Sequence, residues 1–154
     1  MIEVYTDEYF MKIALEEAKK AALADEIPIG AVVVYGKQIL SKAHNQTELL
    51  QDVTAHAEIL AITAAAQNLN SKYLKDCTLY VTLEPCPMCA GALRWAQVSR
   101  LVYAAEDEKM GYLRFGNGLL HPRTSIEYGL LQAECSALLR QFFETKRKEK
   151  SKPS

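Results

Sequence analysis

The spacing of apolar positions predicts four helices. Between residues 7 and 24, apolar side chains recur every three or four positions, as on one face of a helix: Phe10, Ile13, Ala14, Ala18 and Ala21. An alanine-rich helix is predicted from Thr54, as its N-cap, to about Asn68. Pro87 suits the first turn of a third helix, which continues to about Gln97. A last helix is predicted from about Ala133 into the C-terminal tail.

Four mostly apolar segments predict strands, at residues 29–35, 38–43, 78–83 and 100–104. Gly36-Lys37 is the two-residue turn of a hairpin between the first two strands. Strands and helices alternate along the rest of the chain, which implies a sheet with parallel members and helices on its faces. No internal repeat or low-complexity linker divides residues 1–154, so we expect a single α/β domain.

The composition is that of a soluble globular protein, with 49% hydrophobic and 24% charged residues. The apolar runs are shorter than the roughly 18–20 residues that a membrane span needs. The first residues, MIEVYTDEYF, have neither the basic nor the apolar region of a secretory signal. We therefore expect a cytoplasmic protein with reduced thiols, which disfavours a disulfide between Cys86 and Cys89.

Positive charge is concentrated at the C-terminus, although the formal net charge is −1. Residues 140–154 hold six basic and two acidic side chains, which gives +4 for this segment and −5 for the remainder. Such a tail can follow a polyanion, or it can be the solvated end of a helix. Charge alone does not separate these two interpretations.

Two short motifs hold candidate metal ligands. His56-x-Glu58 and Pro85-Cys86-x-x-Cys89 each fall near the start of a predicted helix, at the edge of an open sheet where ligands bind. Two thiolates and one imidazole give three donors. Structural zinc sites normally have four protein ligands, whereas catalytic sites keep one position for water. Among the remaining Cys and His residues, we expect Cys77 and Cys135 to be small buried apolar side chains. We expect His44 and His121 to be loop or edge residues.

Glu58 has two interpretations. It can complement the dipole at the start of its helix, or it can carry protons beside a metal-activated water. The combination of His-x-Glu with a later Pro-Cys-x-x-Cys is the pattern of the zinc deaminases. A structural zinc site has no need of Glu58, and a thiol redox protein would leave both His56 and Glu58 without a role.

Most of the chain resembles the bacterial tRNA-specific adenosine deaminases of the cytidine deaminase-like superfamily. The resemblance is carried by PIGAVVV (28–34), HN (44–45), TAHAEI (54–59), LYVTLEPCPMCAGAL (79–93), RLVYAAEDEKMG (100–111), LLHP (119–122) and GLLQAECSALLRQFF (129–143). It implies a three-layer α/β/α cytidine deaminase-like fold with a central mixed sheet of about five strands, and a basic helical tail from about residue 144. The sequence departs from the family pattern at Gln46-Thr47, at Arg94-Trp95-Ala96 and at residues 112–118, positions that bear on RNA contact and dimer packing.

The resemblance also implies a role for individual residues. His56, Cys86 and Cys89 would bind one Zn²⁺ per chain, and Glu58 would be the catalytic acid–base. Asn45 would hydrogen-bond the target nucleoside, beside Ile29 in the pocket wall and the backbone amide of Ala57. Asp107, Lys109 and Arg147 would approach the RNA. Members of the family are typically homodimers with the helix after the cysteines near the partner, so the resemblance implies a homodimer that binds a tRNA anticodon loop.

The predicted function is hydrolytic deamination of adenosine to inosine at the wobble position of a tRNA anticodon, with the target nucleotide turned out of its stack. One alternative is a deaminase of a free base or nucleoside, such as guanine or cytosine, with the same zinc site. A second is a non-catalytic, zinc-bearing RNA-binding or partner subunit, which could dispense with Glu58.

Overall fold

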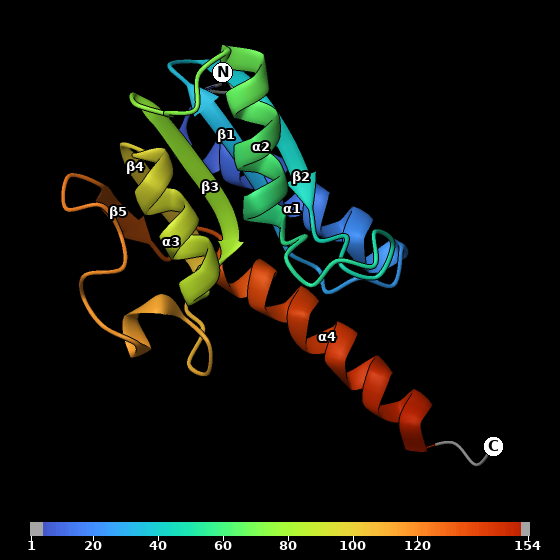
Figure 1. The fold of residues 1–154 in the computed structure, drawn as a ribbon. Coiled ribbons are helices and arrows are strands. Elements are labelled where there is room, and N and C mark those ends of the chain that lie inside the picture. The colour runs from blue at the N-terminus through green and yellow to red at the C-terminus, as the bar shows by residue number, and fades with distance from the viewer. Residues whose placement is uncertain (1–4, 152–154) are drawn as a thin grey trace.

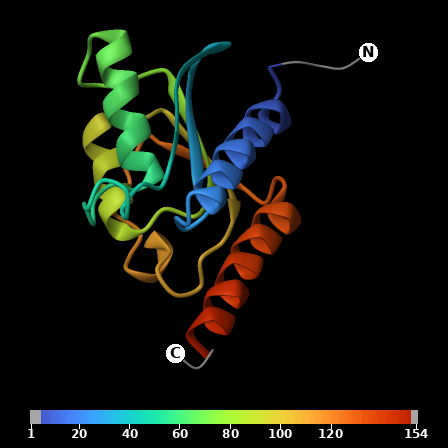
Figure 2. The ribbon, with the colours of Figure 1, turned by 90° about the vertical axis from the view of Figure 1, so that its right-hand side faces the viewer.

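A computed structural model describes residues 5–151 and shows one five-stranded sheet between two layers of helices (Figures 1 and 2). The strands are β1 (Gly30–Tyr35), β2 (Gln38–His44), β3 (Cys77–Leu83), β4 (Arg100–Ala105) and β5 (Ser125–Tyr128). Their order is β2-β1-β3-β4-β5, with β1 antiparallel to both neighbours and β3, β4 and β5 mutually parallel. The predicted three-layer arrangement around a mixed sheet is confirmed.

The helices are α1 (Asp7–Leu23), α2 (Ala57–Leu69), α3 (Pro87–Ala96) and α4 (Gln132–Ser151), with a short 3₁₀ helix, η1, at Tyr112–Arg114. Helices α2 and α3 cover one face of the sheet, whereas α1 and the first turns of α4 cover the other (Figure 2). The rest of α4 extends beyond the sheet (Figure 1). None of the helices in residues 5–151 has both the length and the apolar composition needed to cross a membrane.

Two apolar cores form because successive side chains of a strand point to opposite faces of the sheet. The α2–α3 side receives Val33, Leu79, Val81, Leu101 and Tyr103, and the α1 side receives Val32, Val34, Tyr80, Val102 and Ala104. Helix α1 approaches β1 so closely at Gly30 that a Cβ there would lie 2.6 Å from the backbone nitrogen of Ala18. Only glycine therefore fits at the start of β1.

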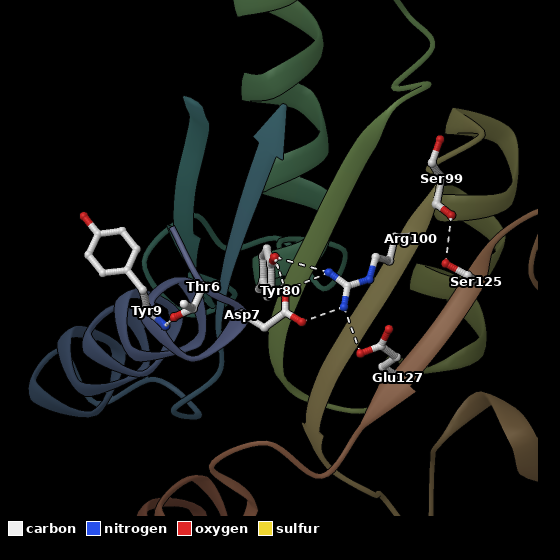
Figure 3. A network of polar contacts seen from close by, with 8 residues as sticks. All are labelled: Thr6, Asp7, Tyr9, Tyr80, Ser99, Arg100, Ser125 and Glu127. Carbon is white, nitrogen blue, oxygen red and sulfur yellow. Dashed lines mark hydrogen bonds and ion pairs between the residues drawn. The ribbon is translucent and has the colours of Figure 1, made fainter. Parts of the chain in front are cut away.

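A polar network fastens the start of α1 to three strands at the end of the sheet where β4 begins (Figure 3). The Arg100 guanidinium donates to both carboxylate oxygens of Asp7, at 2.7 and 2.6 Å, and pairs with Glu127 at 2.8 Å. The Tyr80 hydroxyl donates to Asp7 at 2.7 Å. The hydrogen bonds from Arg100 lower the pKa of the Asp7 carboxyl below its ordinary value, against the opposing effect of burial.

The predicted start of the second helix is wrong. Helix α2 begins at Ala57 with His56 as its N-cap, and Thr54 lies before the helix. The backbone N–H and hydroxyl of Thr54 instead donate to Oδ1 of Asp52, at 2.8 and 2.7 Å. A threonine side chain can form hydrogen bonds in a local turn as well as at an N-cap, and here the nearby Asp52 carboxylate is its partner.

Strand β5 was not located by the sequence pattern. All four of its residues, Ser125–Tyr128, are exposed, although their backbone pairs with β4 in parallel register. An edge strand without a buried face needs no alternation of apolar and polar residues, so periodicity could not reveal it.

Candidate active site

Three side chains with metal-binding atoms converge beyond the carboxyl end of β3. Nδ1 of His56 lies 3.7 Å from Sγ of Cys86 and 3.5 Å from Sγ of Cys89, and all three ligand atoms lie within 4.8 Å of one another. A tetrahedral zinc ion with usual bond lengths places sulfur and nitrogen ligands about 3.6 Å apart. The donor set and its spacing therefore fit a zinc ion held by three protein ligands.

The ends of two helices position this cluster. His56 is the N-cap of α2, and Cys86 is the N-cap of α3, with Pro87 at the first helical position as predicted. Neither N-cap side chain hydrogen-bonds the first turn of its own helix, so both are free to turn towards Cys89. Two positive helix ends facing one point also favour a thiolate there.

The sulfur of Cys86 is the more acidic of the two thiols. A hydrogen bond from Cys89 and the adjacent His56 ring lower the pKa of Cys86 to about 4, against the effect of burial. The hydrogen bond to Cys86 and burial raise the pKa of Cys89. The hydrogen bond to Cys86 also raises the pKa of His56. The lowered pKa of Cys86 favours its thiolate form, which is the form that binds a metal.

Glu58 lies beside the cluster in the first turn of α2 and is only 4% exposed. Burial raises the pKa of its carboxyl to about 7. Its Oε1 is buried and has no hydrogen-bond partner among the described residues. A buried polar atom without a partner is costly, so this oxygen is available to a further group beside the cluster.

A cavity of about 1020 Å³ opens over the cluster. His56, Cys86 and Glu58 form part of its lining, and Cys89 lies buried behind them. Five of the other predicted site residues also line this cavity: Ile29, Asn45, Asp107, Lys109 and Arg147. The structure therefore brings together residues that lie as many as 118 positions apart in the printed sequence.

The Asn45 side chain is buried between β2 and α2. Its Oδ1 accepts a hydrogen bond from the backbone N–H of Ala57 at 2.8 Å, and its own backbone N–H donates to the carbonyl of Ile29 at 3.1 Å. The Ala57 amide is thus engaged by Asn45. The side-chain NH₂ of Asn45 takes no part in this hydrogen bond, and the residue lines the cavity.

Helix α4 forms one wall of the cavity, of which only Arg147 was predicted from the sequence. Leu139, Phe143 and Arg147 follow one another at four-residue spacing, and Arg140 joins them. Lys146 of the same helix forms an exposed ion pair of 2.5 Å with Asp25, just after α1. The regular spacing was the signal that could have identified this face.

Another wall is the segment that follows β4. The Asp107 carboxylate accepts from the backbone N–H groups of Lys109 and Met110, at 3.0 and 3.1 Å, and so shapes its own turn. Buried Glu84 accepts from the N–H of Asp107 at 3.1 Å and from that of Leu113 at 3.2 Å. Glu84 therefore fastens this wall to the end of β3, a role that its sequence context does not reveal.

The other Cys and His side chains lie away from the cluster. Cys77 and Cys135 are buried free thiols within the two apolar cores, as predicted. His44 lies at the end of β2, 3.4 Å from a carboxylate oxygen of Glu17. His121 accepts from the N–H of Arg123 at 3.1 Å in the loop before β5.

Residues 5–147 match the MafB19-like deaminase family. The tRNA-specific adenosine deaminase of Aquifex aeolicus is 46% identical over 142 residues, which cover 89% of this chain and 93% of that protein. That of Bacillus subtilis is 44% identical over 149 residues, which cover 94% and 92%. This chain belongs to the family of the tRNA-specific adenosine deaminases, and is a hydrolytic deaminase.

Solved structures show the same fold. One, from work on A-to-I editing by tRNA:A34 deaminases at the wobble position of transfer RNA, is 40% identical, with a TM-score of 0.79 over 85% of this chain and 99% of that one. The guanine deaminase from Nitrosomonas europaea is 29% identical, with a TM-score of 0.81 over 92% and 86%. The fold thus accommodates both an RNA base and a free base.

Proposed function

We propose that this protein converts adenosine to inosine at the wobble position of a tRNA anticodon, with zinc held by His56, Cys86 and Cys89. The observation that carries the proposal is the cluster of three ligand atoms beside the unpartnered carboxylate oxygen of Glu58. The similarity to proteins named tRNA-specific adenosine deaminases supports the choice of substrate.

Glu58 is the proton carrier in this proposal. A zinc ion in a three-ligand site supplies a Lewis acid that lowers the pKa of water. Glu58 takes one proton from the attacking water and delivers it to N1 of the adenine. It then takes the remaining proton from the same oxygen, now bonded to C6, and delivers it to the 6-amino group, which leaves as ammonia as the C6–N bond breaks and the C6 carbonyl forms. A carboxyl with a pKa near 7 can both accept and return a proton at neutral pH.

Asn45 and Ile29 orient the target nucleoside. Because Oδ1 of Asn45 is held by the amide of Ala57, the side-chain NH₂ has a fixed direction and can donate to the base or the ribose. Ile29 supplies an apolar surface in the cavity wall. A substrate held between fixed partners loses little further freedom as it reacts.

The remaining cavity accommodates the nucleotides beside the target. A base in a stacked strand does not expose C6, so the target must turn out of the anticodon loop. Lys109, Arg140 and Arg147 offer cations along two walls, and Phe143, which is 41% exposed, offers an aromatic face. Cations for phosphates and aromatic faces for bases are the features that bind single-stranded RNA.

We also propose that the protein is a homodimer in which α3 lies near the partner subunit. Trp95 on α3 is 81% exposed and Met88 is 39% exposed, on the helix that carries Cys89. Large apolar side chains exposed together are typical of protein interfaces. Sedimentation equilibrium would reveal the dimer, and a monomer at micromolar concentration would contradict it.

One assay tests the substrate. An anticodon stem-loop with a wobble adenosine is incubated with the protein, in parallel with free adenosine, guanine and cytosine. The matched control RNA carries its adenosine one position away. Inosine at the wobble position alone supports the proposal, whereas turnover of a free base alone favours the function named for the Nitrosomonas europaea protein.

A further inference from the structure

Glu26 is a buried carboxylate that the mechanism above does not use. It lies in the turn between α1 and β1 and is 1% exposed. Its Oε1 accepts from the backbone N–H of Glu48 at 3.0 Å and lies 3.5 Å from the hydroxyl of Thr47. Its Oε2 accepts from the backbone N–H of Leu49 at 2.8 Å. Within residues 5–151 it forms no ion pair, so backbone N–H groups of one segment are what stabilise its charge.

That segment, residues 46–53, connects β2 to α2 and is called here the 46–53 loop. It forms a wall of the cavity through Thr47, Glu48, Gln51, Asp52 and Val53.

Apolar burial does not hold the 46–53 loop in place. Leu49, Leu50 and Val53 are 71%, 49% and 85% exposed. The other hydrogen bonds that residues 47–53 make in the described chain stay within the loop or reach the residues just after it. The bonds to Glu26 are therefore those that fasten the loop to a distant element.

The backbone of Glu26 is hydrogen-bonded to the last turn of α1. Its backbone N–H donates to the carbonyl of Ala21 at 2.9 Å at the end of α1. Ile27 and Ile29, which follow directly, line the same cavity. One carboxylate thus joins two parts of the cavity wall, the turn at residues 26–29 and the 46–53 loop, and Asn45 lies immediately before that loop.

We propose that Glu26 is a positioning residue: its carboxylate fixes the 46–53 loop against the turn at residues 26–29, so that the cavity is shaped in advance for the nucleotides beside the target base. This inference rests on the proposed function. A carboxylate can accept from both backbone N–H groups, whereas the amide of glutamine would direct its NH₂ at one of them. Loss of the charge should therefore loosen the loop and weaken RNA binding. Proton transfer by Glu58, which Glu26 does not contact, should be unaffected.

The test separates binding from chemistry by single-turnover deamination of the stem-loop at increasing enzyme concentration. For Glu26→Gln we expect the half-saturating concentration to rise about tenfold or more, and the rate at saturation to stay within about threefold of wild type. The control is Asp7→Asn, which removes a carboxylate accepting several hydrogen bonds at the far end of the sheet. It should lower thermal stability without changing half-saturation.

If the half-saturating enzyme concentration is unchanged in Glu26→Gln, or rises equally in Asp7→Asn, the positioning role is overturned. Amide hydrogen exchange in the wild-type protein gives a second test that needs no variant to fold. The N–H groups of Glu48 and Leu49 should exchange slowly in spite of the exposed loop, and rapid exchange at both would also overturn the proposal. If the wild-type protein leaves the stem-loop unmodified, the proposed function fails, and exchange still decides whether Glu26 holds the loop.

Discussion

Gly111 lies where the segment after β4 passes closest to the Glu84 carboxylate. A Cβ added there would lie 2.6 Å from the carbonyl oxygen of Asp107 and closer still to the carboxyl of Glu84. The backbone at Gly111 has φ −62° and ψ 145°, which any residue can adopt. The effect of Gly111→Ala is therefore steric: the Glu84 side chain must move, and its hydrogen bonds from the N–H groups of Asp107 and Leu113 are lost.

The magnitude follows from those two bonds. A hydrogen bond to a charged group contributes about 1.5–3 kcal/mol, and partial relaxation of the loop returns some of the loss, so we expect the free energy of unfolding to fall by about 3 kcal/mol. For a domain of this size, that corresponds to a decrease in Tm of about 6–12 °C. Because Asp107 and Lys109 line the cavity, RNA binding should weaken as well.

Thermal unfolding followed by circular dichroism measures the first effect, and single-turnover deamination measures the second. Gly118→Ala is the matched control, since an added Cβ at residue 118 meets no atom within 4 Å. If Gly111→Ala melts within about 2 °C of wild type, as the control should, Glu84 does not hold this wall and the reasoning is refuted.

Three further predictions concern the metal, the proton carrier and the network of Figure 3. Glu58→Gln should retain zinc and fold while kcat falls by about 10²–10⁴, as measured by metal analysis and deamination; a wild-type rate would remove Glu58 from the mechanism. A chelator should remove about one zinc per chain and abolish deamination, with recovery when zinc is added back. Asp7→Asn should lower the free energy of unfolding at pH 7 by about 1 kcal/mol, as measured in urea titrations. The expected loss is small because the Asp7–Arg100 pair is partly exposed to solvent.

The sign of the last prediction depends on the direction of the pKa shift. Arg100 holds the pKa of Asp7 below its ordinary value of 3.8 in the folded protein. The stabilising contribution is therefore fully present above pH 3.8 and is lost as the pH falls through the lower pKa of the folded state. Wild type and Asp7→Asn should thus converge in stability in acid, and a constant difference down to pH 2 would contradict the assignment.

Most of the fold could be predicted from the sequence, because apolar residues recur at a regular spacing wherever one face of a helix or strand is buried. The predicted bounds of the central strands and of α1 and α3 lie within two residues of the observed ones, because each element has a continuous apolar face or a proline at its first turn. The N-terminus of α2 was misplaced, since Thr54 had a competing partner in Asp52. Strand β5 has no buried face and left no periodic signal.

The metal cluster was also accessible to sequence reasoning, because few residue types bind zinc and both motifs lie at helix starts. The cavity walls were not. Asp25 and Glu26 are adjacent acids after a helix, and the sequence gives no reason to treat them differently. The structure shows Asp25 paired with Lys146 near the surface and Glu26 buried beneath the 46–53 loop. Which carboxylate is buried depends on where a segment twenty residues later folds back, and local pattern carries no information on that.

Glu26 and Glu84 share a physical property that bears on how this site can vary. Each is a buried carboxylate whose partners in a cavity wall include backbone N–H groups, those of Glu48 and Leu49 on one side and of Asp107 and Leu113 on the other. Backbone N–H groups are present whatever side chain a residue carries, except in proline. Side chains along both walls can therefore change, and with them the nucleotides that fit the cavity, while the walls keep their positions. Thr47 lies beside the anchored N–H groups of Glu48 and Leu49 and lines the cavity, so a different side chain there can alter the surface offered to RNA while the backbone hydrogen bonds to Glu26 remain.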